Sequence, residues 1–564
     1  MEKKKKLIIM GVILLLIIVS GATFAILTWN STMIKLGINT NCFTINYTKG
    51  GDITGSLKLI NEEVLISNGK FTIKDGVGVS AVNIGINSNC SIEGYGRILL
   101  NVTNISSTFT TGDSKGALKY AVLNNTSSIT DIKSITSTSL NSQSFDIVAM
   151  GSITSGGVKD ILVRQLSNTE LYKYIIVIYV DNNLAGNDIT EGVFTGNISA
   201  DATQGLINAD YTLNRLYNLN NSIVLDTTHT PDFTTVSGNN GKDNNNNTGL
   251  GDGTKGIYKS EDDFGTSYYF RGAVDNNYVK FANFYWRIIR INGDSSIRMI
   301  YAGTSTHANG ESENDSHIGN SVYNVNYQDN GYVGYMYGNF TTPTNCSTDD
   351  NNVTTCTSGS TSYEEAHANI NDSTIKTYID SWYNTYLSKY AYAIADTIYC
   401  NDRSVTPVES FAGIALTGTG KGTENTAYSG LTRGCISHNP SLKCVNKNDR
   451  FTVKNNIGNA KLTNPIGLIS SDEVIMGGLT NYDIVNDAYI ANPDSYLITD
   501  YWYWTLTPSA AEGGYTYVYI VNFDILSSDS DVFMSNGGVR PVVSLSSDAI
   551  SGGSGTMSDP FTVS

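Results

Sequence analysis

Aromatic residues near the C-terminus have the spacing expected of a binding surface. Tyr501, Trp502, Tyr503 and Trp504 are consecutive, so in a strand the two tryptophans share one face and the two tyrosines the other. Exposed aromatic faces suit sugars or a protein partner. Tyr515 and Tyr517 alternate in the same way, so the proposed ligand residues here are Trp502, Trp504, Tyr515 and Tyr517. The alternative is that these aromatic residues serve mainly as core and hairpin packing.

Two other segments resemble catalytic or metal sites only in their letters. Residues 112–116 read G-D-S-K-G, but a nucleophile elbow needs a helix after the serine, and a strand-like run follows here. His307 and His317 lie among acidic residues in a polar stretch that is typical of a solvated loop. We therefore expect no catalytic residue, no metal ligand and no cofactor, and we do not expect an enzyme.

The seven cysteines are spaced for disulfides rather than for metal binding, because no C-x-x-C occurs. Three pairs are hypothesised, namely Cys42 with Cys90, Cys346 with Cys356, and Cys400 with Cys444. Cys435 is left over. The alternative is that several of these residues stay as thiols.

The N-terminus predicts export. Four lysines at positions 3–6 precede an apolar run over residues 7–29, which is long enough to span a bilayer as a helix. Lysines on one side predict that the N-terminus is cytoplasmic and that the bulk of a single-pass protein is extracellular at the cell membrane. The competing interpretation is a signal peptide with its core at residues 7–19, cleaved after Ala25, which would give a secreted protein.

Composition narrows the class of partner. The chain has 564 residues and a net charge of -16, with 36 basic and 52 acidic residues. An acidic surface repels phosphate backbones, so nucleic acid is excluded as a partner. Only 16% of residues are charged and 35 are tyrosine, a composition that favours a β-rich exported protein. We expect the membrane, through the N-terminal helix, and a surface glycan or protein as partners.

The elements that must position these residues fall into two regions. Residues 35–205 alternate apolar and polar positions in short runs separated by turns, which predicts a β-sandwich of jelly-roll or immunoglobulin-like type. The run at 174–180, YIIVIYV, is apolar on both faces and is the predicted central strand. Residues 206–257 form a predicted linker that is rich in Asn and Gly from 237.

Residues 258–548 mix both kinds of element, which predicts an α+β domain. A β-hairpin is expected from 284–291 and 297–301, and a helix over 373–395. Ser470 and Glu473 form a predicted capping box at the start of a second, short helix. Residues 549–564 are interpreted as a Gly/Ser-rich C-terminal tail.

Six linked motifs carry a family resemblance. They are FYWRIIRINGD at 284–294, YCNDRS at 399–404, LKCVNKNDRFTV at 442–453, NPIGLISSDEVIMGG at 464–478, YWTLTP at 503–508 and GGVRPVVSLSSD at 537–548. Together they resemble an uncharacterised family of exported Firmicutes surface proteins, over residues 258–564. The closing order of Trp, aromatic strand and G-V-R-P-V also resembles C-type-lectin-like folds, including the formylglycine-generating-enzyme type and the variable proteins of diversity-generating retroelements.

The resemblance implies roles for particular residues. It implies ligand residues within 515–536, with Asn522, Asp524, Asp529 and Asp531 as the polar candidates, and structural roles for Arg540 and Trp286. No cysteine follows Cys444, which departs from the formylglycine-generating type and argues against oxidase chemistry. The segments GATFAILTWNS at 21–31 and VFTGNISADATQ at 193–204 resemble exported β-sandwich matrix proteins of the TasA and camelysin type.

The expected function is non-catalytic recognition or adhesion by a membrane-tethered surface protein, through the lectin-like domain. The alternative is a structural or matrix component that assembles through the β-sandwich. The third and least favoured is an oxidase of the formylglycine-generating type.

Overall fold

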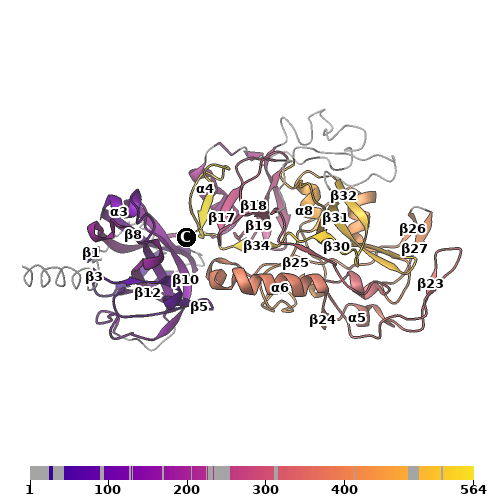
Figure 1. Ribbon diagram of the computed structural model, residues 1–564, viewed down its shortest axis with the longest axis horizontal. Helices are drawn as coiled ribbons and strands as arrows, with labels where there is room; N and C mark the ends of the chain where they lie inside the picture. Colours follow the sequence, from indigo (N-terminus) through magenta and orange to yellow (C-terminus); the bar gives the residue numbers. More distant parts are fainter. Residues whose placement is uncertain are drawn as a thin grey trace, which may run out of the picture. The chain divides into compact units, whose positions relative to one another are not determined.

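The computed structural model describes residues 25–29, 43–88, 94–125, 129, 131–167, 170–204, 206–220, 222–223, 225–226, 231, 233, 255–309, 315–411, 413–479, 495–522 and 525–563. The chain divides into two compact units. Unit 1 is Met1–Ile207 with Lys389–Ala393 and Ser564, and unit 2 is Asn208–Ser388 with Ile394–Val563. Strands dominate both units (Figure 1), which confirms the predicted β-rich class.

Two sheets make up most of unit 1. The first has the order β11 (Gly157–Leu166), β8 (Gly94–Ile105), β13 (Val193–Gln204), β1 (Ala25–Trp29), β3 (Thr54–Leu57). The second has the order β2 (Phe43–Lys49), β7 (Gly78–Ser88), β12 (Leu171–Asp181), β9 (Leu118–Asn124), β10 (Ser144–Ser152), β6 (Lys70–Thr72), β5 (Ile66–Ser67), with β4 (Leu59–Ile60) on β12. Short helical elements connect them, namely α2 (Glu62–Leu65), α3 (Ser107–Thr110), η1 (Asn182–Leu184) and η2 (Ile189–Glu191).

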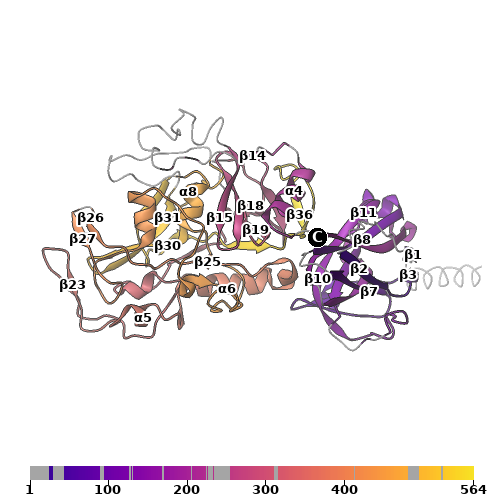
Figure 2. The same ribbon diagram turned by 180° about the vertical axis from the view of Figure 1, so that it is seen from behind.

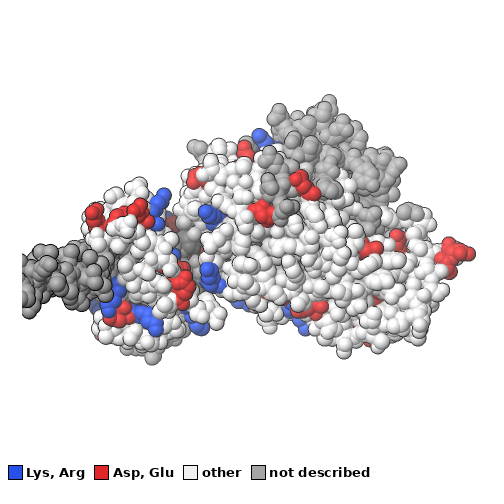
Figure 3. Space-filling model, viewed as in Figure 1, with Lys and Arg blue, Asp and Glu red and all other residues white. Residues whose placement is uncertain are grey.

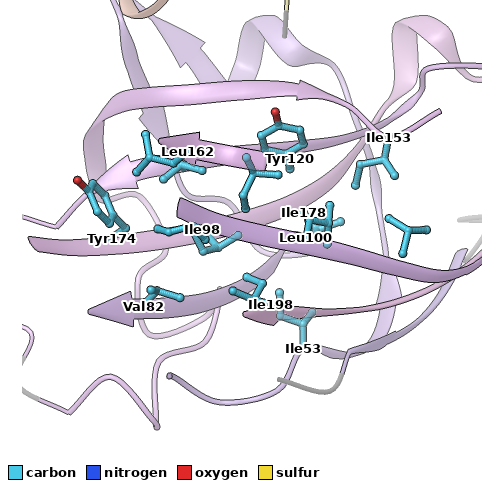
Figure 4. Packing of buried hydrophobic residues seen from close by; sticks show 14 of the residues in the cluster. Ile53, Val82, Ile98, Leu100, Tyr120, Ile153, Leu162, Tyr174, Ile178 and Ile198 are labelled. Atoms are coloured by element: carbon cyan, nitrogen blue, oxygen red, sulfur yellow. The ribbon is translucent and has the colours of Figure 1, made fainter. Parts of the chain in front are cut away.

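Strand β12 is central, as predicted, since it pairs with β7 on one side and β9 on the other. Its even-numbered residues, such as Ile176 and Ile178, pack with Ile98 and Leu100 of β8 in the core between the two sheets (Figure 4). Its odd-numbered residues, such as Val177, belong to a second buried cluster on the other face. Alternation with both faces buried explains why this strand is apolar throughout.

The apolar N-terminal segment lies mostly outside the described residues. Its last five residues, Ala25–Trp29, form strand β1, which pairs with β13 and β3, so the helix expected over residues 7–29 is wrong for this part. No helix in the described ranges is long and apolar enough to cross a membrane.

Unit 2 contains two larger sheets. The first has the order β14 (Leu225–Asp226), β15 (Gly256–Asp262), β16 (Gly265–Arg271), β18 (Phe284–Ile291), β17 (Tyr278–Phe281), β36 (Phe561–Val563), β35 (Ile550–Gly552), with β19 (Ile297–Gly303) between β18 and β34 (Val542–Leu545). The second has the order β20 (Asn320–Ser321), β33 (Gly537–Gly538), β30 (Tyr503–Glu512), β31 (Tyr515–Asn522), β32 (Ile525–Asp531), with β28 (Thr426–Ala427) on β30. Strands β18 and β19 lie close together in both views (Figures 1 and 2), and their pairing confirms the predicted hairpin.

Shorter elements complete unit 2. The strands are β21 (Met336–Tyr337), β22 (Ser347–Thr348), β23 (Thr354–Thr355), β24 (Asn371–Asp372), β25 (Tyr399–Cys400), β26 (Val408–Phe411), β27 (Ile414–Leu416) and β29 (Arg450–Phe451). The helical elements are α4 (Ala209–Leu219), η3 (Asn330–Val333), α5 (Tyr363–Ala366), α6 (Thr374–Tyr386), α7 (Ser429–Leu431), the π-helix η5 (Thr432–Ile436), η6 (Lys447–Asp449) and α8 (Ser471–Met476). All residues of η4 (Ser388–Ala393) after Ser388 belong to unit 1.

The two predicted helices form, with one difference in length. Helix α6 begins where Ser373 accepts a hydrogen bond from the backbone N–H of Lys376, and it ends at Tyr386, nine residues before the predicted end. Its Trp382 packs against Phe284 and Tyr301, with ring centroids 5.3 and 5.8 Å apart. Helix α8 begins with the predicted capping box of Ser470 and Glu473.

Two segments that composition assigned to a linker and a tail contain regular structure in unit 2. Helix α4 lies within the predicted linker and contacts β16 and β18. The segment interpreted as a tail contributes β35 and β36, and β36 pairs with β17. The Arg215 guanidinium donates to the carbonyl of Ile550 at 2.7 Å, so the helix and the tail strands bind each other. The Asn/Gly-rich residues 237–254 lie outside the described residues.

Candidate functional site

A two-residue turn positions Tyr515, the most exposed of the predicted ligand residues whose side chains the structure describes. Strands β30 and β31 are joined by Gly513 and Gly514, whose φ angles of +57° and +81° are those of a type I′ hairpin turn. Residues with a Cβ rarely adopt these angles, so the two glycines fix the turn and the pairing of Glu512 with Tyr515 that follows it. Tyr515 is 40% exposed at the first position of β31.

Three rings meet beside this turn and form what we call the aromatic surface: Tyr327, Tyr515 and Phe533. Ring centroids are 5.3 Å apart for Tyr327 and Tyr515, 4.5 Å for Tyr327 and Phe533, and 6.2 Å for Tyr515 and Phe533. Phe533 is 38% exposed. Val325 and Met534, which neighbour these residues in sequence, are also exposed.

Backbone hydrogen bonds join the three segments that carry the rings. The Thr516 hydroxyl donates to the carbonyl of Tyr327 at 2.9 Å, and the N–H of Val532 donates to the carbonyl of Thr516 at 3.1 Å. The N–H of Asn324 donates to the carbonyl of Val532 at 2.8 Å. The rings are therefore held in place before any ligand arrives, which lowers the entropic cost of binding.

A disulfide-closed loop supports the same turn. Cys346 and Cys356 are bonded, as predicted, and close the loop that contains β22 and β23. Within this loop the carbonyl of Asn352 accepts a hydrogen bond from the Asn425 side chain at 2.9 Å. The side-chain oxygen of Asn425 in turn accepts from the N–H of Gly513 at 3.2 Å. The loop thus braces the turn that positions Tyr515.

Trp504 does not contribute to a binding surface. Its side chain is fully buried, and its indole N–H donates to the carbonyl of Ser321 at 2.8 Å. The predicted ligand role of Trp504 is therefore wrong, and the packing alternative holds for this residue. Trp502 is half-buried and lies on the same face, with its ring centroid 5.1 Å from that of Trp504.

The remaining predicted residues are spread along the hairpin. Asn522 is at the far end of β31 from Tyr515, seven residues or roughly 23 Å away at the rise of a strand. Trp502 lies at that same far end, because Tyr503 pairs with Val521. Tyr517 is half-buried and pairs with Asp531 of β32, near the aromatic surface. Asp524 and the side chain of Asp529 lie outside the described residues. The structure therefore groups Tyr515, Tyr517 and Asp531, and separates Trp502 and Asn522 from them.

Sequence reasoning missed Tyr327 and Phe533. Phe533 lies within the stretch 515–536 that the resemblance indicated, but the selection there considered tyrosines and polar residues. Tyr327 comes from a loop almost 190 residues earlier, and the stacked rings and the hydrogen bond from Thr516 connect it to β31. No local sequence signal could have found it.

Arg540 and Trp286 are buried. The Arg540 guanidinium donates to the carbonyls of Tyr301 at 3.0 Å and Leu497 at 3.1 Å, and lies 4.7 Å from the centre of the Tyr503 ring. Trp286 donates from its indole N–H to the carbonyl of Phe281 at 3.1 Å. Both side chains tie core segments together.

A second candidate is a cavity of about 30 Å³ inside unit 2, which we call the charged cavity. Five of the six motif segments contribute to its wall, through Arg290, Asp402, Lys443, Glu473 and Thr507 among others. A cavity of this volume has room for roughly two water molecules. Its walls come from segments up to about 245 residues apart, so the motifs did not reveal it.

The charges of this cavity are paired with one another. Arg290 contacts Asp262 at 2.7 Å and Glu473 at 2.9 Å, and Arg298 contacts Glu473 at 2.6 Å. Arg433 lies 2.7 Å from Asp402 and 2.8 Å from Asp472.

Glu473 lies between two of these arginines and stays ionised. Burial by itself would raise the pKa of Glu473, but the positive charges of Arg298 and Arg290 lower the pKa below its ordinary value. These ion pairs connect the walls of the charged cavity. Because the paired charges offset one another, they offer no strong charge to a ligand.

The two segments that resemble catalytic or metal sites in their letters do not have the geometry of such sites in the described part of the chain. Ser305 and Asp315 both contact Nε2 of His307, at 3.4 and 2.8 Å, whereas a catalytic triad uses the two different ring nitrogens. Ser114 of the G-D-S-K-G stretch is buried and bonds to Asp188 at 2.6 Å. The described ranges contain no group of three or more His, Cys, Asp or Glu arranged to hold a metal ion.

The remaining cysteines are accounted for as far as the described residues reach. Cys400 and Cys444 are bonded, which confirms the second predicted pair. Cys435 is a buried thiol whose sulfur lies 3.2 Å from the Tyr519 hydroxyl. The predicted pair of Cys42 and Cys90 lies outside the described residues.

Comparison with known proteins gives no relative: no protein-family model matches the chain, and no curated protein sequence matches it.

Proposed function

We propose that this protein is a membrane-tethered extracellular surface protein that binds neutral glycans through the aromatic surface. The observation that carries the proposal is the contact of Tyr327, Tyr515 and Phe533 at the β30–β31 turn, with two of the rings more than a third exposed. An exposed aromatic face can pack against the apolar C–H face of a sugar ring, and a tyrosine hydroxyl can bond to a sugar hydroxyl.

The spacing of the rings favours a flat ligand over a cation. An aromatic cage for a quaternary ammonium needs rings that stand apart, so that the cation lies between them. The centroids of Tyr327 and Phe533 are only 4.5 Å apart, so there is no room for a cation between these two rings. Ligand contact therefore takes place on the outer surface of the cluster.

Charge supports an uncharged ligand. Only 16% of the residues are charged, and Figure 3 shows few charged residues on the face of unit 2 that it presents. Asp531 on β32, opposite Tyr517, is suited to accept hydrogen bonds from sugar hydroxyls. An anionic ligand would meet unfavourable charge from an acidic protein.

The proposed location rests on the N-terminal sequence and on the disulfides. Lysines at positions 3–6 and the apolar run after them favour a membrane segment with the bulk of the chain outside. The two disulfides fit an oxidising compartment. We assign unit 2 to the C-type-lectin-like class on the closing order of Trp504, aromatic strand and G-V-R-P-V segment.

The test is a glycan and protein array probed with the purified exported chain, as wild type and as Tyr515→Ala, Phe533→Ala and Tyr217→Ala variants. Tyr217 is the matched control, because it is 37% exposed on α4 and belongs to no aromatic cluster among the described residues. We expect saturable binding to uncharged glycans that both surface variants lose and the control keeps.

Three outcomes would contradict the proposal. The first is an array with no glycan signal, and the second is binding that all three variants keep. The third is a signal confined to protein spots, which would make the aromatic surface a protein-binding site.

A further inference from the structure

Lys376 is an unusual lysine because its side chain is almost completely buried, with 1% of its surface exposed. It lies in the first turn of α6, and its ammonium contacts Asp372 at 3.1 Å and Asp380 at 2.8 Å. Lysine is rarely buried to this extent unless it is paired. The two aspartates explain the burial, but only Asp380 links the lysine to another part of the chain.

Asp380 connects Lys376 to a side-chain amide. One carboxylate oxygen of Asp380 accepts from the Lys376 ammonium, and the other accepts from the Asn464 amide nitrogen at 2.8 Å. Asn464 is 8% exposed and lies 88 residues after Lys376, at the start of the 464–478 motif. A buried primary amine and a buried carboxamide are therefore held by the two oxygens of one carboxylate, whose own side chain is 17% exposed.

Buried tyrosines surround this group. Tyr335 is fully buried, and its hydroxyl has no hydrogen-bond partner in the described part of the chain. Burial, together with the negative charge of Asp380, raises the pKa of Tyr335 well above its ordinary value, so its hydroxyl stays protonated and able to donate. Burial also raises the pKa of Tyr383, and the negative charge of Asp380 raises it further.

We propose that Lys376 and Asn464 form an intramolecular amide bond, with Asp380 as the catalytic acid and base. Asp380 takes a proton from the Lys376 ammonium, which makes the amine nucleophilic. The amine nitrogen attacks the side-chain carbonyl carbon of Asn464, and a new C–N bond forms. Asp380 gives this proton to the amide nitrogen and takes a second proton from the attacking nitrogen, the old C–N bond breaks, and ammonia leaves. No oxidant or reductant is needed.

The bond would join two segments that the hydrogen bond from Asn464 to Asp380 already connects. Helix α6 packs on β18 and β19 through Trp382, whereas the segment after Asn464 pairs with β34 through Gly467 and Val542. A covalent link between them would survive unfolding and disulfide reduction. Exclusion of water favours the reaction, because water would compete as a nucleophile and would stabilise the charged amine.

The test is a peptide map of the full exported chain after reduction, alkylation and trypsin digestion. We expect one branched peptide that contains both Lys376 and Asn464, lighter than the sum of its two parts by one ammonia molecule. We also expect trypsin to leave the chain uncut after Lys376, because an acylated lysine is not recognised.

Variants separate the chemistry from the fold. Asp380→Asn should keep the side-chain volume and abolish the branched peptide, and Lys376→Met should abolish it as well. Lys119→Met is the control, since Lys119 also contacts two carboxylates, Glu62 and Asp181, in unit 1. Separate, unmodified peptides for Lys376 and Asn464 in the wild-type protein would overturn the proposal, whatever the variants do. A branched peptide that persists in Asp380→Asn would overturn the role of Asp380.

Discussion

At Gly537, the first residue of the segment 537–548, the backbone lies very close to a buried side chain of the core. A Cβ at this position would lie 1.8 Å from the indole nitrogen of Trp504. The G-G pair before V-R-P-V is therefore explained by contact with the tryptophan. It is not explained by a backbone angle, since Gly537 is not among the glycines with positive φ.

Gly537→Ala should destabilise unit 2 by about 3 kcal/mol, because the added methyl group must displace the Trp504 ring and its bond to Ser321. The free energy of unfolding in urea, followed by tryptophan fluorescence, measures the change. The control is Gly156→Ala in unit 1, where the nearest atom to the added Cβ is 3.6 Å away. The control should change stability by less than about 0.5 kcal/mol. Equal effects of the two substitutions would contradict the argument.

His367 makes stability depend on pH. It is 1% exposed, and burial lowers its pKa well below 6.5, with a further contribution from the charge of Arg403. The folded state therefore keeps this histidine neutral in a range where the unfolded chain binds a proton. The stabilisation that comes from keeping His367 neutral is therefore fully present above pH 6.5. Below pH 6.5 the free energy of unfolding decreases by up to about 1.4 kcal/mol per pH unit.

His367→Gln removes this proton uptake. Its unfolding free energy should fall less steeply than that of the wild type between roughly pH 6.5 and pH 4.5, although its stability at pH 8 is lower. Urea unfolding at a series of pH values gives both slopes. Parallel curves for the two proteins would show that His367 does not titrate on unfolding.

Residue types alone indicated a binding role for Tyr515 and for Trp504, but only one of them is exposed. Alternation shows which aromatics share a face, and it does not show which face is buried. That choice depends on Ser321 and Gly537, which contact Trp504 from other segments. The disulfide of Cys346 and Cys356 was predictable because only ten residues separate the partners.

Elements with a strong local signal were predicted well. The hairpin of β18 and β19 has two apolar runs around a polar turn, and α8 has a capping box, so each is determined by its own residues. Strand β1 and the strands of the C-terminal segment were missed for the opposite reason. Ala25–Trp29 continues an apolar run, and 549–563 is rich in Gly and Ser, so their pairing partners decide their structure.

The C-terminal segment should be required for the stability of unit 2. Phe561 on β36 is fully buried beside β17, and the carbonyl of Gly555 accepts from the N–H of Tyr278 at 2.8 Å. Phe561→Ala should cost about 3 kcal/mol of unfolding free energy through the cavity it leaves.

Urea unfolding of the full chain measures that loss, and Met557→Ala is the control because Met557 is 39% exposed in the same segment. A Phe561→Ala protein as stable as the Met557→Ala protein would mean that β36 does not support the fold.

At the scale of the whole molecule, the two units differ in what they offer to a partner. The core of unit 1 consists of two apolar clusters, one on each face of the sheet that contains β12. Such a core suits unit 1 to act as a stable support. Unit 2 contains the charged cavity, both observed disulfides and the aromatic surface. We therefore propose that unit 2 is the part that binds a partner and that the N-terminus is the part that attaches to the membrane.

The affinity of the exported chain for its best array glycan tests the central claim most directly, measured by calorimetric titration of the wild type, Tyr515→Ala and Tyr217→Ala. Loss of an aromatic contact of about 2 kcal/mol predicts a roughly 30-fold weaker Kd for Tyr515→Ala. The Tyr217→Ala protein should bind as the wild type does. An unchanged Kd for a folded Tyr515→Ala protein would contradict the claim that the aromatic surface is the binding site.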